Sequence, residues 1–188
     1  MRIVAGRFGG RRLAALGKGD PAAHLRPTTD RVREALFSAL EGGRYGDPLD
    51  GARVLDLFAG TGALGLEALS RGAAHVTFVE NGRNAQRLLT DNIAALGVAG
   101  ETTLLRTDAT RLPPAGAPAT LVFLDPPYGQ GLGATALASA LAKGWIAPDA
   151  LIVWEEAAPM HAPGGFTDLG SRRYGETHVS FLRLLPDG

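Results

Sequence analysis

The sequence predicts an α/β fold, with a mainly parallel sheet, helices on both of its faces and an antiparallel edge formed by the end of the chain. From residue 53 onward, short apolar segments alternate with segments of helical spacing, a pattern typical of a parallel sheet. The 188 residues have the length of one domain, which can bury its core without disulfide bonds. The chain has no cysteine, which excludes thiolate metal sites, disulfides and a cysteine nucleophile.

The start of the chain is expected to form a small β-hairpin. Two segments, Arg2–Phe8 and Arg11–Leu16, flank Gly9-Gly10. A pair of glycines is typical of a tight hairpin turn because both residues can adopt positive φ. This hairpin would begin an N-terminal extension.

A helix is expected next, over Arg31–Leu40, where apolar residues recur at helical spacing. Thr28 or Thr29 could cap its start, and Gly42-Gly43 could end it. A second turn at Pro48–Gly51 separates this extension from the alternating segments. The turn divides the chain into an extension of residues 1–47 and a core domain of residues 48–188.

The core domain carries five strand segments separated by helices or turns and then a closing hairpin. The strand segments are rich in Val, Leu and Phe and are short enough to be buried strands. The predicted strands are Arg53–Phe58, His75–Glu80, Thr102–Arg106, Leu121–Leu124 and Leu151–Trp154. The predicted helices are Ala63–Arg71, Arg83–Leu96 and Leu132–Lys143, and the hairpin joins Phe166–Arg172 to His178–Leu184 about Tyr174-Gly175.

The net charge of zero conceals an uneven distribution of charge. Residues 1–33 carry eight basic and two acidic side chains, a net charge of +6, and the other residues carry −6. A basic segment on an acidic body is typical of an arm that binds a polyanion. A solvated arginine-rich surface would have the same composition, so the charge alone leaves both interpretations open.

Other features of the composition restrict the class of protein. No apolar run approaches the length of a membrane span, and the first residues lack the apolar region of a signal peptide. Four scattered histidines, at positions 24, 75, 161 and 178, offer little for a metal site. We therefore expect a soluble, cytoplasmic, monomeric protein without a bound metal.

A glycine-rich turn follows the first strand of the core. Gly60, Gly62 and Gly65 match G-x-G-x-x-G between a strand and a helix, where glycines let a ligand approach the backbone closely. Glu80 ends the next strand, 20 residues after Gly60, and a carboxylate there can accept hydrogen bonds from both ribose hydroxyls. The pattern predicts a ligand with an adenosine part.

Asp56, just before this turn, narrows the choice of ligand. Its carboxylate would repel a pyrophosphate but would suit a ligand with an ammonium group beside its ribose, and S-adenosylmethionine has that group, a sulfonium cation and no phosphate. Phe58 and Ala59 also separate the strand from the first glycine, whereas dinucleotide fingerprints start their glycines directly after the strand. The turn favours S-adenosylmethionine and leaves a NAD(P) dinucleotide as the alternative.

A second motif, Asp125-Pro126-Pro127-Tyr128, follows the fourth strand of the core. The prolines stiffen a turn at the carboxyl end of a parallel strand, where open α/β sheets bind ligands. The Asp125 carboxylate and the Pro126 carbonyl are acceptors, and Tyr128 adds a flat ring. We predict that these three catalytic residues clamp the exocyclic amino group of a planar base.

With these motifs in this order, the sequence resembles class I S-adenosylmethionine-dependent methyltransferases that act on an amino nitrogen. The resemblance implies a Rossmann-like sheet of seven strands whose last strand is antiparallel. It also implies that Asp108, which precedes Ala109, meets the adenine amino group of the methyl donor. The expected donor site comprises Asp56, Phe58, Gly60, Gly62, Glu80, Asn81, Asp108 and Ala109.

Further segments resemble the RsmD-type 16S rRNA (guanine-N2)-methyltransferases. They are the opening Arg2-Ile3-Val4-Ala5-Gly6 with Gly10-Arg11-Arg12-Leu13, the segment Arg26–Phe37, and the ending Tyr174–Thr177 with Val179-Ser180-Phe181. The resemblance implies methylation of a guanine 2-amino group in 16S rRNA, within a small-subunit assembly particle. The basic residues expected to hold RNA phosphates are Arg2, Arg7, Arg11, Arg12, Arg26 and Arg31.

Other substrates remain open on the residues alone. A protein-glutamine methyltransferase would use a similar clamp, usually with Asn in place of Asp125, and would not need the basic extension. A methyltransferase for another RNA base or for DNA adenine is a second alternative, although DNA enzymes usually carry a larger recognition domain. A NAD(P)-binding oxidoreductase is the remote alternative.

Overall fold

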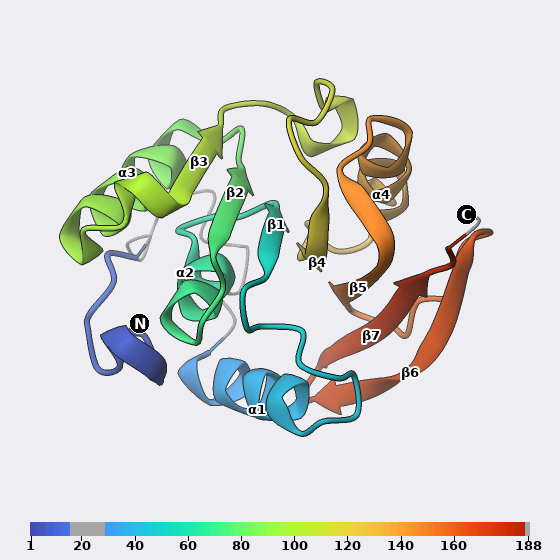
Figure 1. The fold of residues 1–188 in the computed structure, drawn as a ribbon, viewed down its shortest axis with the longest axis horizontal. Helices are drawn as coiled ribbons and strands as arrows, with labels where there is room; N and C mark the ends of the chain where they lie inside the picture. The colour runs from blue at the N-terminus through green and yellow to red at the C-terminus, as the bar shows by residue number, and fades with distance from the viewer. Residues whose placement is uncertain (16–28, 187–188) are drawn as a thin grey trace.

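The computed structural model describes residues 1–15 and 29–186, and these form one seven-stranded sheet (Figure 1). The strand order is β3-β2-β1-β4-β5-β7-β6. Strands β1 to β5 pair in parallel, and β7 is antiparallel to both of its neighbours, which confirms the Rossmann-like sheet with an antiparallel last strand. The strands are β1 (Arg53–Leu57), β2 (His75–Val79), β3 (Thr102–Leu105), β4 (Ala119–Leu124), β5 (Ile146–Glu156), β6 (Phe166–Tyr174) and β7 (Thr177–Leu184).

Helices cover both faces of the sheet, as predicted (Figure 1). One hydrophobic cluster joins the sheet to three helices, and a second cluster joins the opposite face to one helix and a short 3-10 helix. Because both faces are covered, the central strands are apolar throughout rather than alternating. The first three helices are α1 (Asp30–Glu41), α2 (Ala63–Ser70) and α3 (Arg83–Leu96), and the opposite face holds α4 (Leu132–Ala142) and η4 (Ala109–Arg111).

One strand near the end of the chain differs from its prediction. Strand β5 begins at Ile146, five residues before the predicted start. The added residues include Pro148 and Asp149, and the φ of Asp149 is +61°. The pairing of β5 with β4 shifts register at this point. This irregularity interrupts the apolar pattern that would have indicated the start of the strand. The last strand, β7, lies between β5 and β6, so the outer strand at this edge of the sheet is β6.

The predicted N-terminal hairpin was wrong in its details. Within the described residues 1–15, one isolated antiparallel bridge forms, between Arg2 and Arg12, and Gly6–Phe8 is a 3-10 helix rather than part of a strand. The reason is that Val4 and Ala5 donate their N–H groups to the carboxylate of Glu67, at 2.8 and 3.0 Å, instead of to a partner strand. The end of the second predicted strand, Leu16, lies outside the described residues.

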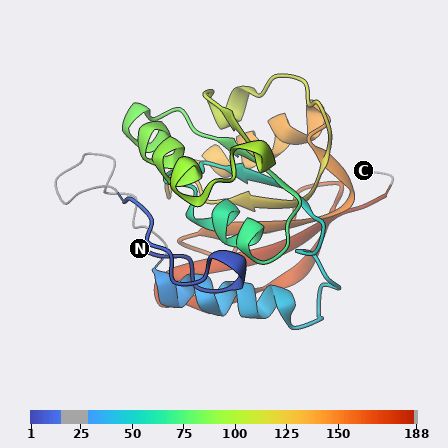
Figure 2. The same ribbon diagram turned by 60° about the vertical axis from the view of Figure 1, so that its left-hand side comes forward.

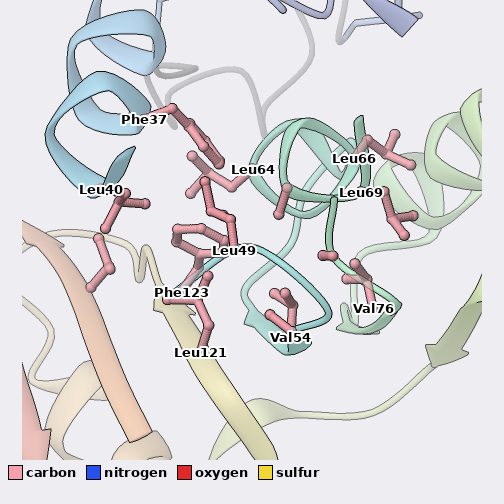
Figure 3. Close-up of a cluster of buried hydrophobic side chains, with 14 of the residues drawn as sticks. Phe37, Leu40, Leu49, Val54, Leu64, Leu66, Leu69, Val76, Leu121 and Phe123 are labelled. Carbon is pink, nitrogen blue, oxygen red and sulfur yellow. The ribbon is translucent and has the colours of Figure 1, made fainter. Parts of the chain in front are cut away.

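Helix α1 and the N-terminal segment are built into the same core as the sheet. Ile3 is fully buried in the cluster that also holds Phe37 and Leu40 of α1. Figure 3 shows Phe37 and Leu40 beside Leu64 of α2 and Phe123 of β4. Figure 2 shows the first residues running beside α1 and α2.

A buried ion pair connects these elements. Arg33 of α1 and Glu67 of α2 are both fully buried, with 3.5 Å between Arg33 Nε and Glu67 Oε2. Arg33 also donates to the Arg2 carbonyl, and Arg71 Nε donates to Glu67 Oε1 at 2.8 Å. Thr29 caps α1 by accepting from the N–H of Val32 at 3.3 Å. Glu67 therefore joins the first residues, α1 and α2.

Burial of the N-terminal segment predicts an effect of Ile3→Ala on stability. Removing this side chain should lower the free energy of unfolding by about 2–5 kcal/mol, because it leaves a cavity in a close-packed core. Arg12→Ala, at an exposed position nine residues away, should change it by no more than about 0.5 kcal/mol. Urea unfolding followed by circular dichroism measures both. A loss below about 1 kcal/mol for Ile3→Ala would show that the segment is not part of the core.

Candidate active site at the carboxyl edge of the sheet

Asp56 is a buried carboxyl group next to the last residue of β1. Its neighbours Leu55 and Leu57 belong to the cluster under α4, so its side chain points to the opposite face, toward α2. There it accepts a hydrogen bond from the N–H of Gly65 at 3.0 Å. Burial raises the pKa of Asp56 to about 7, and the charges of Glu80 and Glu155 add to this shift. The site would favour a positive charge beside Asp56.

Glu80 follows β2 and binds the backbone of two turns. Its Oε2 accepts from the N–H of Gly60 at 2.7 Å, and its Oε1 accepts from the N–H of Gly82 at 2.7 Å. Gly60 has φ +57° and open space where a side chain would lie. The N–H groups of Gly60 and Gly65 are thus bonded to carboxylates, and an anionic phosphate would have to compete with those carboxylates for them.

The other two glycines of the motif serve the packing of α2 and α3. A Cβ on Gly62 would lie 2.3 Å from Leu89 Cδ1, and a Cβ on Gly65 would lie 2.4 Å from Phe78 Cε1. Close approach of helix and sheet therefore requires glycine at both positions. Of the three glycines in the G-x-G-x-x-G motif, Gly60 is the one at which an added Cβ would meet no atom within 4 Å.

Asn92 of α3 connects this glycine turn to the N-terminal segment. Its Nδ2 donates to the carbonyl of Thr61 at 2.9 Å and to that of Ala14 at 3.2 Å, and its Oδ1 accepts from the N–H of Ala14 at 2.7 Å. Asn92 is buried. The start of the chain is therefore in contact with the predicted donor site, a link that the sequence did not indicate.

Asp108 lies beyond the carboxyl end of β3 and caps the 3-10 helix η4. Its Oδ1 accepts from the N–H and the hydroxyl of Thr110, both at 2.8 Å. These hydrogen bonds lower the pKa of Asp108, so the carboxylate is ionised at neutral pH. Among its predicted neighbours in the donor site, Ala109 is buried, Asn81 is exposed and Phe58 has φ +60°.

Asp125 directly follows β4, on the same face of the sheet as Asp56. It is partly buried, and its N–H donates to the carbonyl of Leu57 at 3.4 Å. Burial, followed by the charges of Glu155, Asp56 and Glu156, holds the pKa of the Asp125 carboxyl well above its usual range. Since β1 pairs with β2 on one side and β4 on the other, Asp56 and Asp125 stand at the switch point of the sheet, where such folds bind ligands.

Tyr128 is one of two large hydrophobic side chains that are exposed among the described residues, at 39% of its surface. Its hydroxyl lies 3.1 Å from the Thr177 hydroxyl, at the start of β7. Burial of the hydroxyl end raises the pKa of Tyr128 to about 12. The ring is thus held at one end and accessible over part of its surface, as a stacking platform requires.

Sequence reasoning missed two acids that belong to this edge. Glu155 and Glu156 end β5, beside Asp125, because Leu124 pairs with Trp154 in register. Glu155 is 2% exposed, and Glu156 Oε1 accepts from the N–H of Gly129 at 3.4 Å. The signal was present, since both acids follow an apolar strand segment just as Asp56 and Asp125 do.

The arginines predicted to bind RNA have different surroundings. Arg2 pairs with Asp30 at 3.8 Å, Arg7 pairs with Glu101, and Arg11 donates to the carbonyl of Ala95 at 2.7 Å. Arg12 and Arg31 are exposed, and Arg26 lies outside the described residues. RNA binding by all six stays a prediction.

Within residues 1–15 and 29–186, no cluster of three or more His, Cys, Asp or Glu side chains could bind a metal ion. In the same ranges, no helix has the length and hydropathy needed to cross a membrane.

The known proteins that this chain resembles include several that are named as methyltransferases. Residues 1–183 match the model of the family described as Conserved hypothetical protein 95. Over 156 residues, 82% of this chain and 74% of the relative, the chain is 41% identical to Ribosomal RNA small subunit methyltransferase D of Escherichia coli strain K12. The protein of that name from Haemophilus influenzae is 34% identical over 93% of this chain and 89% of its own length. The solved structure of Escherichia coli yhhF superposes with a TM-score of 0.82 and 36% identity, covering 98% of each chain.

The close approach at Gly65 predicts the sign of the effect of Gly65→Ala on stability. Helix propensity alone would favour Ala by about 1 kcal/mol. The contacts of the added methyl with Phe78 and Val76, at 2.4 and 2.7 Å, should outweigh this and lower the free energy of unfolding by about 1–3 kcal/mol. Gly100→Ala, which meets no atom within 4 Å, is the control. Stabilisation by Gly65→Ala in thermal unfolding would contradict the packing role.

Proposed function

The chain belongs to the family described as Conserved hypothetical protein 95, the RsmD type, and on this premise we propose that it is an rRNA methyltransferase. In this proposal it transfers a methyl group from S-adenosylmethionine to the 2-amino group of a guanine in 16S rRNA. The observation that carries the proposal is the position of Asp125 and Tyr128 at the same edge of the sheet as the donor-side acids Asp56 and Glu80. The names of the relatives support small-subunit rRNA as the substrate.

The residues present fit S-adenosylmethionine better than a dinucleotide. Asp56 is a buried carboxyl group whose pKa is raised to about 7, so a cationic ligand would be stabilised there and a pyrophosphate repelled. The two glycine N–H groups that could bind phosphate are already bonded to Asp56 and Glu80. When bound, S-adenosylmethionine supplies an electrophilic methyl group.

Each donor-side acid has a distinct task in this proposal. Glu80 accepts the ribose hydroxyls with its remaining lone pairs, since each of its oxygens has one backbone N–H already. Asp108, ionised at neutral pH, accepts the adenine amino group. Asp56 faces the ammonium group, whose positive charge would favour the ionised form of the carboxyl.

The target clamp, formed by Asp125, Pro126 and Tyr128, has to make a poor nucleophile reactive. The lone pair of the guanine 2-amino nitrogen is delocalised into the ring, and hydrogen bonds from its protons to Asp125 and the Pro126 carbonyl would favour a pyramidal nitrogen and stabilise its developing positive charge. The amino group becomes acidic once it is methylated, so it releases its proton without a strong general base. Tyr128 stacks on the base, as unpaired RNA bases commonly do on aromatic rings.

Asp125→Ala tests the chemistry. Donor affinity should change little because the glycine turn is untouched, whereas turnover should fall about 10²–10³-fold through loss of a preorganised polar contact in the transition state. Asp125→Asn, which keeps an acceptor oxygen, should lie between this variant and the wild type. The assay is transfer of a tritiated methyl group to unmethylated small-subunit particles, with nucleosides identified by mass spectrometry. Wild-type turnover in a folded Asp125→Ala enzyme would exclude the mechanism, and N6-methyladenosine as product would exclude the guanine assignment.

Asp56 predicts that donor binding is linked to proton release. Below pH 7 the free protein holds a proton on Asp56, and the ammonium group of the ligand favours the ionised form. Affinity for S-adenosylhomocysteine should therefore rise with pH up to about 7, by at most about tenfold per pH unit, and level off above it. Calorimetry at pH 6 in two buffers of different ionisation enthalpy measures the protons released. Asp56→Asn should lose this release, and Asp91→Asn, an exposed acid on α3, should keep it. Unchanged proton release by Asp56→Asn would contradict the assignment.

A further inference from the structure

The tip of the β6–β7 hairpin lies at the same edge of the sheet as the target clamp. His178, the second residue of β7, pairs with Glu156 at the end of β5, and Thr177 pairs with Tyr174 across the tip. Because β5 is parallel to β4, the end of β5 lies next to Asp125. Figure 1 shows this hairpin at one end of the sheet and β3 at the other. The hairpin therefore flanks the target side of the edge, away from the donor-side acid that follows β3.

Two arginines approach this tip along β6. Arg172 and Arg173 are both exposed and project to opposite faces of the strand. Arg173 Nε donates to the carbonyl of Gly175 in the turn at 2.7 Å, which keeps its guanidinium beside the tip. Both side chains are open to solvent, whereas Arg2 and Arg7 of the N-terminal extension pair with acids. Glu176 in the turn reduces the local positive charge. Binding of an anion at this tip would therefore depend on individual contacts of the two arginines, not on a large positive patch.

The same hairpin holds the ring of the clamp. Thr177, the first residue of β7, is the hydrogen-bond partner of the Tyr128 hydroxyl at 3.1 Å. An exposed aromatic ring next to exposed arginines is the combination by which proteins bind unpaired nucleic acid, with stacking on the base and ionic contacts to the phosphates. A displacement of the hairpin tip would move the ring with it.

We propose that the tip of the β6–β7 hairpin binds the RNA backbone beside the target nucleotide through Arg172 and Arg173, and that Thr177 is a positioning residue that sets the Tyr128 ring. This inference rests on the proposed function, because it takes the Asp125 clamp to hold an RNA base. It places a phosphate contact on the target side of the edge, in addition to the basic N-terminal extension. The occupant is a single-stranded RNA segment; an acidic protein surface is the competing occupant.

The first experiment removes the two arginines. The Arg172→Ala/Arg173→Ala variant should bind a 16S rRNA transcript at least about tenfold more weakly near physiological salt, and the slope of log affinity against log salt should become less steep by about 0.7 for each lost contact to a single strand. Affinity for S-adenosylhomocysteine should stay unchanged. The matched control, Arg87→Ala/Lys143→Ala, removes two exposed cations outside the hairpin and should alter RNA affinity much less.

The second experiment tests the positioning role of Thr177. Thr177→Val should lower kcat about threefold to tenfold with little change in KM for RNA, since the ring remains but its orientation is released. Thr177→Ser should restore kcat because it keeps the hydroxyl. Tyr128→Phe should show the same defect, and the double variant Thr177→Val/Tyr128→Phe should be no worse than either single variant, because both remove one hydrogen bond. Thermal unfolding checks that all variants fold.

The outcomes separate this inference from the proposed function. If the wild type methylates rRNA but the double arginine variant binds RNA with unchanged affinity and salt slope, the hairpin surface is excluded while the methyltransferase proposal stands. Additive losses of kcat in the Thr177 and Tyr128 cycle would exclude the positioning role. If the wild type transfers no methyl group to rRNA, the proposed function fails. A selective loss of RNA affinity in the arginine variant would even then support the RNA-binding surface, and an unchanged RNA affinity with loss of binding to an acidic protein would exclude it.

Discussion

Crowding of carboxyl groups on one face of the sheet is the constraint on which the rest of the site depends. Asp56, Glu80, Asp125 and Glu155 follow or end neighbouring strands, and burial with mutual repulsion raises the pKa values of Asp56 and Asp125. Such groups must bind protons, accept hydrogen bonds or meet a cation. The glycine turn supplies part of this need, because Gly60 and Gly65 donate to Glu80 and Asp56. The proposed cationic donor and amino-group target would supply the positive charge and the hydrogen-bond donors that these carboxyl groups still need.

A second constraint is the buried ion-pair cluster around Glu67. The buried carboxylate of Glu67 accepts hydrogen bonds from the backbone of Val4 and Ala5 and contacts Arg33 and Arg71. Buried charges of this kind are costly to leave without partners, so the first residues, α1 and α2 are held together. Asn92 extends this connection to the glycine turn. The N-terminal segment is therefore packed against the glycine turn of the proposed donor site, and it also carries positive charge.

In the proposed function, the order of the strands separates recognition of the methyl donor from recognition of the target base along one edge. Glu80 and Asp108 follow β2 and β3, on the donor side of the switch point between β1 and β4. Tyr128 and the hairpin tip lie on the side of β5 and β7, where Thr177 reaches the ring. Asp56 and Asp125 stand between them. In this proposal the methyl group passes from the donor side of the edge to the target side at the switch point between β1 and β4.

The sequence by itself determined what depends on residues close together in the chain. The strand–turn–helix at Asp56 to Gly65, the acid at Glu80 and the proline turn after Asp125 are local patterns. The structure has the described elements within a few residues of their predicted bounds, apart from the early start of β5 and the N-terminal hairpin. Tertiary structure decided the contacts between distant residues. Glu67 replaced the partner strand of Val4 and Ala5, Asp30 and Glu101 paired with arginines of the extension, and Thr177 met Tyr128. These pairs are separated by 28 to 94 residues, and only the order of strands in the sheet and the burial of charge bring such partners together.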